Sequence, residues 1–286
     1  MMRFIKSSLI LAVSVLLAGS SGWAQQPERF AVPLSNPGQP ARLEVNLMSG
    51  GITVKTQPGN EVIVEARIEQ GEREAQDSPE SKARPDVEAK ARGMKRLTIP
   101  TAGLEIEEEN NRVSVQSSSL RNVVNVVIFV PAASSVKLNT VKDGDILIEG
   151  VTGEIEAGST TGSITLKGVS GAAVANAVTG EIDAAFTRLA PDKTMSFTTL
   201  NGDIDLTLPA DARARLNIKS QMGEIFSDFD MTTEVVTSGP ETAKPAKAGK
   251  YRVKIERAIV GTINGGGPEI QFKTFTGNIY IRKAGK

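Results

Sequence analysis

Apolar and polar residues alternate in short segments through the middle of the chain, and each segment begins with glycine. These glycines stand at positions 144, 153, 162, 171 and 180, at a constant spacing of nine residues. After most of them, isoleucine occupies the second position and an apolar or small residue the fourth, while Asp, Glu, Ser or Thr occupy the first and third. This period of two is typical of a β-strand with one buried and one solvated face.

The same unit recurs outside this stretch, with an early copy at Gly50 and later copies up to position 277. The copy at Gly171 departs from the pattern, because Ala173 and Ala175 leave Val174 out of phase. A leading glycine, usually preceded by Thr, Ser or Asn, indicates a tight corner between strands. The pairs that define the repeat are Gly144 and Ile146, Gly153 and Ile155, Gly162 and Ile164, Gly180 and Ile182, Gly202 and Ile204, Gly223 and Ile225, and Gly277 and Ile279.

Stacking explains why such a unit repeats. One short strand cannot bury its isoleucine alone, but strands about 4.8 Å apart would line the isoleucines into one inward row. With two units per coil, the steps between the glycines at 144, 162, 180, 202 and 223 are 18, 18, 22 and 21 residues. The sequence therefore predicts an all-β fold, a β-solenoid similar to a single-stranded β-helix with coils of about 18–22 residues.

An antiparallel β-sandwich is the alternative fold, because evenly spaced short strands suit that architecture too. The solenoid is favoured since a sandwich has no reason to place isoleucine at the same register in every copy. Two segments interrupt the pattern: residues 70–95 are charged and poor in apolar side chains, and residues 238–250 are rich in Lys, Ala, Pro and Gly. We expect both to be flexible insertions in a single solenoid domain that spans residues 25–286.

The first residues have the layout of a secretory signal peptide. Arg3 and Lys6 precede an apolar run of about 12 residues, and the small residues Gly22 and Ala24 follow. A membrane-spanning helix needs roughly 20 apolar residues, so cleavage after Ala24 is the better interpretation. Residues 1–24 are thus expected to be removed, which leaves a periplasmic or secreted product with no membrane span.

Composition narrows the possible functions. The chain has no cysteine and no histidine, which excludes disulfides and argues against zinc sites and catalysis by Ser-His or Cys-His pairs. Basic and acidic residues balance at 33 each, so no basic footprint indicates nucleic-acid binding. Nothing in the sequence calls for a cofactor.

Acidic residues next to the corner glycines suggest one metal hypothesis. Calcium takes six to eight oxygen ligands, and a ladder of carboxylates on neighbouring coils could supply them. The weak candidates are Asp145, Glu181, Asp203 and Glu224. Solvated strand faces explain these acids better, because stacked like charges repel each other and because Ser163 and Asn278 interrupt the ladder.

The Gly-Asp/Glu-Ile strands behind a signal peptide, together with the closing segment from Gly261 to Arg282, resemble a bacterial family of exported β-solenoid domains that are named as adhesins and have no known function. The resemblance implies the solenoid fold and attachment to surfaces, and it supplies no catalytic residues. The family's motifs are structural, so they specify fold more than activity.

These observations predict a non-enzymatic, adhesin-like or scaffold protein of the cell envelope, without catalytic residues. Its partners would be envelope proteins or glycans, or further copies that associate through the solenoid ends. One alternative is a polysaccharide-active enzyme on a β-helix, with Asp203 and Asp205 as its acid pair. Another is a self-assembling accessory protein of the envelope stress response.

Overall fold

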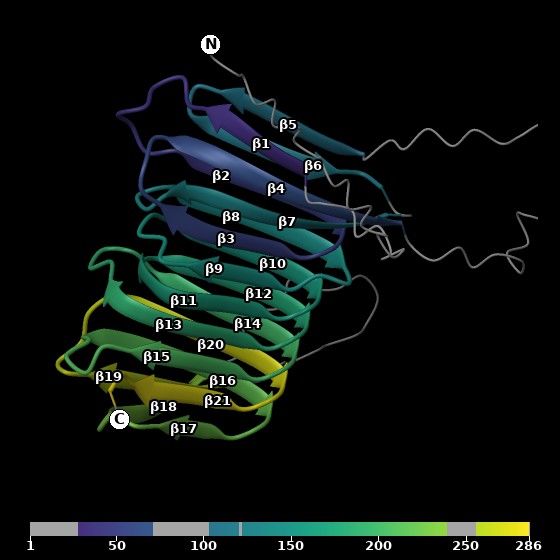
Figure 1. Ribbon diagram of the computed structural model, residues 1–286. Helices are drawn as coiled ribbons and strands as arrows, with labels where there is room; N and C mark the ends of the chain where they lie inside the picture. Colours follow the sequence, from purple (N-terminus) through teal and green to yellow (C-terminus); the bar gives the residue numbers. More distant parts are fainter. Residues whose placement is uncertain (1–27, 71–102, 120–121, 239–255, 286) are drawn as a thin grey trace, which may run out of the picture.

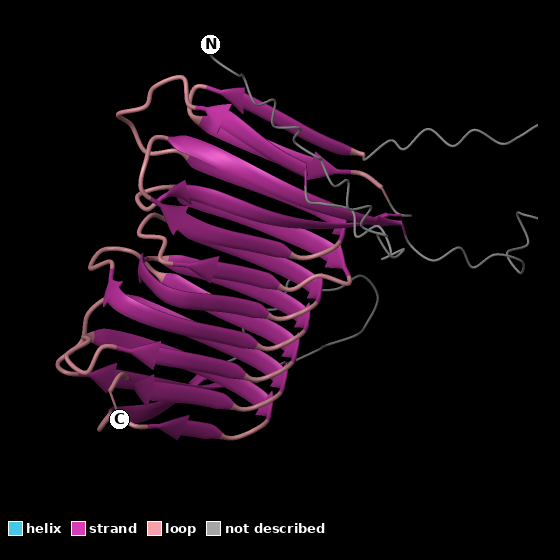
Figure 2. Ribbon diagram, viewed as in Figure 1, coloured by secondary structure: helices cyan, strands magenta, loops and turns pink. Residues whose placement is uncertain are grey.

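Two β-sheets face each other across one hydrophobic core in the computed structural model, which describes residues 28–70, 103–119, 122–238 and 256–285 (Figure 1). Every regular element of these residues is a strand (Figure 2). No helix in the described part of the chain is long and apolar enough to cross a membrane.

Sheet A contains ten strands and sheet B eleven. In spatial order, sheet A consists of β1 (Glu28–Pro33), β4 (Glu61–Gln70), β7 (Asn122–Pro131), β3 (Ile52–Gln57), β9 (Ile146–Glu149), β11 (Ile164–Gly171), β13 (Ile182–Leu189), β15 (Ile204–Leu208), β21 (Ile279–Lys283) and β17 (Ile225–Ser227). Sheet B consists of β18 (Thr232–Ser238), β19 (Glu256–Ile263), β16 (Ala214–Met222), β20 (Glu269–Thr276), β14 (Met195–Asn201), β12 (Ala173–Thr179), β10 (Ile155–Thr161), β8 (Ser135–Lys142), β2 (Arg42–Ser49), β6 (Arg112–Ser117) and β5 (Leu104–Glu109).

From β8 to β15 the chain alternates between the sheets, so one strand of sheet B and one of sheet A make a coil. Neighbouring coils pair in parallel, with Ile164 aligned to Ile146 and to Ile182. The predicted β-solenoid is therefore confirmed. Antiparallel pairing is confined to the two ends of the stack, where β4 joins β7, β5 joins β6, and β19 joins β16.

The coils do not stack in chain order. The C-terminal coil β20–β21 lies between the coils β14–β15 and β16–β17, and Figure 1 shows its yellow strands among green ones. At the other end, β2–β3 lies between β6–β7 and β8–β9. The steps derived from the sequence placed the Gly223 unit directly after the Gly202 unit, and this was wrong. Each coil with a corner glycine places that glycine and its isoleucine at the same positions, so any of these coils can pair with any other, and the order along the chain does not decide which coils become neighbours.

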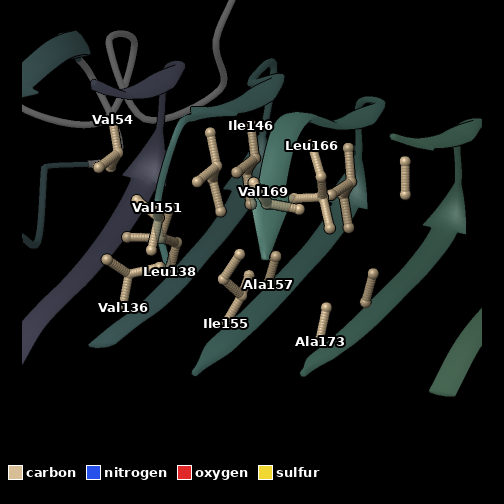
Figure 3. Close-up of a cluster of buried hydrophobic side chains, with 14 of the residues drawn as sticks. Val54, Val136, Leu138, Ile146, Val151, Ile155, Ala157, Leu166, Val169 and Ala173 are labelled. Carbon is tan, nitrogen blue, oxygen red and sulfur yellow. The ribbon is translucent and has the colours of Figure 1, made fainter. Parts of the chain in front are cut away.

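The isoleucines of sheet A form the expected inward row. Six are fully buried: Ile52, Ile146, Ile164, Ile182, Ile204 and Ile279. Ile225 ends the row on the edge strand β17 and is only partly buried. Ile155 does not belong to this row, because Gly153 turns the opposite corner and places Ile155 in sheet B between Val136 and Ala173. Figure 3 shows side chains from the two sheets pointing toward one another.

Small and large side chains share one row in the core of sheet B. Ala157 and Ala175 share a row with Phe197 and Phe272, since these residues are aligned across successive strands. The two phenylalanine rings stack with centroids 5.9 Å apart. In the Gly171 unit the alanines face the core while Val174 points outward. The adjacent strand β14 places the large side chains Met195 and Phe197 beside these alanines.

Three sequence expectations lie outside the described residues: the signal peptide at 1–24, almost all of the insertion at 70–95, and the insertion at 238–250 apart from its first residue.

Candidate functional site

Before seven of the sheet A strands, a corner glycine brings the backbone of one coil very close to the backbone of the neighbouring coil. A Cβ atom added to Gly144 would lie 1.9 Å from the carbonyl oxygen of Gly50 in the preceding coil. The same approach, within 1.9–2.2 Å, recurs along the stack. Its members are Gly50, Gly144, Gly162, Gly180, Gly202, Gly277 and Gly223. The corner glycines therefore set the closest distance between coils.

After four of the corner glycines, the side chain of the next residue links its coil to a neighbouring one: Asp145, Ser163, Asp203 and Asn278. Asp145 Oδ1 accepts a hydrogen bond from the backbone N–H of Ser163 at 2.8 Å. Asp203 Oδ1 accepts one from the N–H of Asn278 at 2.7 Å, and Asn278 Oδ1 accepts one from the N–H of Glu224 at 2.9 Å. Side chains at this position thus satisfy backbone donors that the corner leaves without a ladder partner.

The four calcium candidates, Asp145, Glu181, Asp203 and Glu224, all lie in this column. Ser163 separates Asp145 from Glu181, and Asn278 separates Asp203 from Glu224, as the aligned strands require. Asp145 and Asp203 already use an oxygen for the neighbouring coil. In the part of the chain that the structure describes, no three Asp, Glu, His or Cys side chains are grouped to hold a metal ion. Asp145 and Asp203 act here as hydrogen-bond acceptors.

A second column of hydroxyls supports the same corner from inside. Thr199 Oγ1 donates to the carbonyl of Gly180 at 3.0 Å, and Thr274 Oγ1 donates to that of Gly202 at 3.2 Å. Thr140, Ser159 and Ser220 make the equivalent bond to the preceding coil. Sequence analysis missed this column, although its signal is visible: Ser or Thr stands three or four residues before the corner glycine.

Asp203 and Asp205, the acid pair of the enzymatic alternative, do not act together. Asp203 faces the corner, whereas Asp205 lies on the outer face of sheet A and accepts two hydrogen bonds from Arg282 Nε at 2.9 and 2.7 Å. Beside it, partial burial raises the pKa of Asp183, and the negative charge of Asp205 raises it further. Asp203 and Asp205 are thus each engaged by a residue of the neighbouring coil β20–β21, Asp203 by the N–H of Asn278 and Asp205 by Arg282.

Arg282 also lies over the ring of Tyr280, at 5.2 Å from its centroid. Phe226 stacks on Tyr280 with centroids 5.2 Å apart and an angle of 9°. The ring of Tyr280 is therefore partly covered by Arg282 and Phe226, while Phe226 on the edge strand β17 is 45% exposed.

The outer face of sheet B carries a row of exposed apolar side chains, which we name the apolar stripe. It consists of Val141, Val178, Leu200 and Phe275, which are 44%, 45%, 48% and 42% exposed. Thr160 occupies the same position on β10, so the row crosses the strands β8, β10, β12, β14 and β20 at one register. On β16 this position is Gln221, and Met222, which is 62% exposed, is aligned with Thr276 one residue farther along.

Around the middle of the apolar stripe the surface is polar but uncharged. The neighbouring positions toward the strand starts are Gly158, Asn176 and Thr198, and those toward the corner are Thr161, Thr179 and Asn201. Charges flank the stripe only at its ends, with Lys142 on β8 and Lys273 on β20. Within two residues of Val178 and Leu200, the central strands therefore present aliphatic, hydroxyl and amide groups.

A second surface feature has the opposite character. A groove of ≈ 430 Å³ crosses the strand starts of sheet B and is lined by charged residues. Six of its seven charged side chains pair with each other: Arg112 with Glu44, Lys137 with Glu156 and Lys193 with Glu154, all at 2.9 Å. Self-paired charges leave little attraction for a ligand, which makes the apolar stripe the stronger candidate.

Comparison with known proteins shows the family. Two solved structures are similar: a putative cell adhesion protein from Clostridium sporogenes, with 9% identity, a TM-score of 0.38 and coverage of 90% of this chain and 100% of that one, and a putative adhesin from Bacteroides fragilis, with 10% identity, a TM-score of 0.40 and coverage of 91% and 98%. No curated protein matches the sequence. The family model described as Toastrack DUF4097 matches residues 38–264, and this chain belongs to that family.

Proposed function

We propose that this protein is a non-enzymatic, adhesin-like binding module that docks a partner protein against the apolar stripe. The observation that carries the proposal is the register: four large apolar side chains, each more than two-fifths exposed, stand in one row across five neighbouring strands, with Thr160 at the remaining position. Single exposed apolar residues are common on soluble proteins, but a contiguous set marks an interaction surface.

The length of the stripe suits a protein contact. Four strand-to-strand steps of about 4.8 Å separate Val141 from Phe275, which makes the row about 19 Å long. A rigid row of that length fits an extended segment or a helix that offers its own apolar side chains in line.

The surroundings of the stripe support a protein partner over a glycan or a nucleic acid. Val178 and Leu200 are aliphatic, whereas sugar rings are usually bound on open aromatic faces. A nucleic acid would need a basic surface, and no Lys or Arg lies within two residues of Val178 or Leu200 along the chain. An apolar surface with an uncharged rim fits a protein surface of the same kind.

We also propose an extracytoplasmic location, periplasmic or secreted, which the signal-peptide layout of residues 1–24 and the adhesin-like family support. The partner would then be a protein of the envelope or of a neighbouring surface.

Adhesion measured with the variant Val178→Asp/Leu200→Asp tests the proposal. Beads coated with residues 25–286 are passed over immobilised envelope vesicles of the source bacterium. We expect the variant to reduce bead retention at least about tenfold, because two carboxylates would be desolvated against an apolar partner. The control Thr165→Asp/Thr207→Asp places two charges on the outer face of sheet A and should retain wild-type adhesion.

The vesicles themselves distinguish the partner. Protease treatment should abolish retention, and periodate oxidation of glycans should leave it unchanged. Retention of the stripe variant at the wild-type level would show that the stripe is not the docking surface, and sensitivity to periodate alone would show that the partner is a glycan.

A further inference from the structure

The last coil of the chain occupies an interior slot of the solenoid. β20 pairs in parallel with β14 on one side and with β16 on the other, and β21 pairs with β15 and β17. We infer that this slot accepts the C-terminal coil of a second copy as well as its own, so that two chains can exchange residues 269–283 and form a dimer.

Both walls of the slot match the coil that fills it. Gly277 lies between Gly202 and Gly223 in the glycine ladder, and Ile279 is aligned with Ile204 and with Ile225. An incoming coil with this register completes the inward row on both sides.

The contacts inside the slot specify this particular coil. The ring of Phe272 stacks on Phe197, and Phe272 is aligned with Ile218 on the opposite wall. Asn278 joins the two walls, because its N–H donates to Asp203 and its Oδ1 accepts from Glu224. The occupant is therefore a second copy of the chain's own C-terminal coil.

A short connection joins the coil to the preceding strand β19. It is the segment from Asn264 to Pro268, which includes three consecutive glycines, and the φ angles of Asn264, Gly265 and Gly266 are positive. An element that swings on such a hinge can be exchanged at low cost, because every contact except the hinge forms again in the partner.

The order of synthesis favours exchange. Strands β16 to β19 precede β20 in the chain, so the outer wall of the slot is made before the coil that joins it to the stack. The linker from β15 to β16, residues 209–213, spans two coil levels, while the equally long linker from β13 to β14, residues 190–194, spans one. The outer wall, β16 and β17, pairs with β20 and β21 and not with β14 and β15. It is thus held to the rest of the stack chiefly through the C-terminal coil that fills the slot, whichever chain supplies that coil.

Two single-cysteine variants test the exchange, since the natural chain contains no cysteine. Asn201 and Thr276 are aligned neighbours on β14 and β20. The variants Asn201→Cys and Thr276→Cys are unfolded, mixed, refolded together and oxidised. Only an exchanged dimer places position 276 of one chain beside position 201 of the other, so we expect a covalent heterodimer on a non-reducing gel.

The matched control mixes Thr179→Cys with Asn201→Cys. These positions are aligned on β12 and β14, in the same column but between coils that do not exchange. We expect at least about fivefold more heterodimer from the 201/276 mixture than from the 179/201 mixture. Equal yields, including none from either mixture, would overturn the proposal; a dimer formed through the apolar stripe would link both mixtures alike.

A hinge variant provides a second readout. Deletion of residues 264–267 leaves one residue between β19 and β20, and its reach of about 7 Å is shorter than the roughly 9.6 Å across β16, so the coil can fill only a partner's slot. Size-exclusion chromatography with light scattering should then show a dimer as the main folded species. A folded monomer with wild-type circular dichroism would contradict the exchange.

Discussion

At the residue scale, this fold needs glycine for two different physical reasons, which Gly144 and Gly168 illustrate. Gly144 has an ordinary φ, but a Cβ there would lie 1.9 Å from the carbonyl oxygen of Gly50. Gly168 has a φ of +60° and open space around it. The first position excludes a side chain by contact, and the second disfavours one by backbone conformation alone.

Alanine substitutions should therefore have unequal costs. Gly144→Ala forces two backbones apart and should lower the free energy of unfolding by about 3 kcal/mol or more. Gly168→Ala places a side chain in the left-handed region at a cost of about 1–2 kcal/mol. Urea unfolding followed by circular dichroism measures both, and equal losses would show that coil contact at the corner is not limiting.

Ala177 marks a gap in the hydroxyl column. It lies between Ser159 and Thr199 in the aligned strands β10, β12 and β14, and it is buried. Ala177→Ser would place a hydroxyl where its neighbours donate to a corner carbonyl, and it should stabilise the fold by about 1 kcal/mol. Thr199→Ala removes such a bond and should destabilise by a similar amount. Thermal unfolding measures both, and a loss of stability in Ala177→Ser would mean that the site cannot admit the hydroxyl.

At the element scale, the sequence predicted where strands begin but not how they are ordered. The offset of Ile146 from Gly144 marks the start of β9, and the same rule marks β11, β13 and β15. The rule fails to assign sheets, as Ile155 shows, because two opposite corners use the same glycine signal. The rule also does not predict that β20–β21 lies between β14–β15 and β16–β17, because every coil with a corner glycine has the same glycine-to-isoleucine spacing and would fit any position in the stack.

The candidate surface was less predictable than the fold. Val141, Val178, Leu200 and Phe275 come from four strands whose relative alignment depends on the stacking order. Their local sequences show only an apolar residue two or three positions before a corner glycine. The row exists because stacking aligns them, so it becomes visible only after the coil order is known.

The outer face of sheet A supplies a prediction on pH. Burial, and next the charge of Asp205, raise the pKa of Asp183 above its ordinary 3.8, although Lys167 and Arg282 oppose the shift. A carboxyl group with a raised pKa favours the folded state below its unfolded pKa and loses that contribution as pH rises through the folded value. Asp183→Asn should therefore stabilise the protein at pH 7 by at most about 1 kcal/mol, because solvent screens this partly exposed site.

Thermal unfolding between pH 3 and pH 7 checks this assignment. The advantage of Asp183→Asn over the wild type should disappear as the pH falls below 3.8, where Asp183 is protonated in both folded and unfolded states. An advantage that persisted unchanged to pH 3 would indicate a packing effect in place of a charge effect.

At the scale of the whole molecule, the two sheets end at different levels. Beyond the coil β16–β17, sheet B continues with β19 and β18, whereas the described part of sheet A ends at β17. β18 is therefore an edge strand of the described structure, and Val235 and Val236 on its two faces are 65% and 39% exposed. A β-branched edge strand with free backbone groups is a template for pairing with another chain.

A charge on this edge should limit disordered association without weakening the fold. Val235→Lys adds a cation to an exposed position, so it should slow aggregation in concentrated or heated solution while unfolding stability stays within about 0.5 kcal/mol of the wild type. Static light scattering during heating measures the aggregation rate. The control Thr165→Lys adds the same charge to the outer face of sheet A, away from the edge. If the control slows aggregation equally, net charge governs the process; if only Val235→Lys does so, the open edge of β18 is where copies first pair.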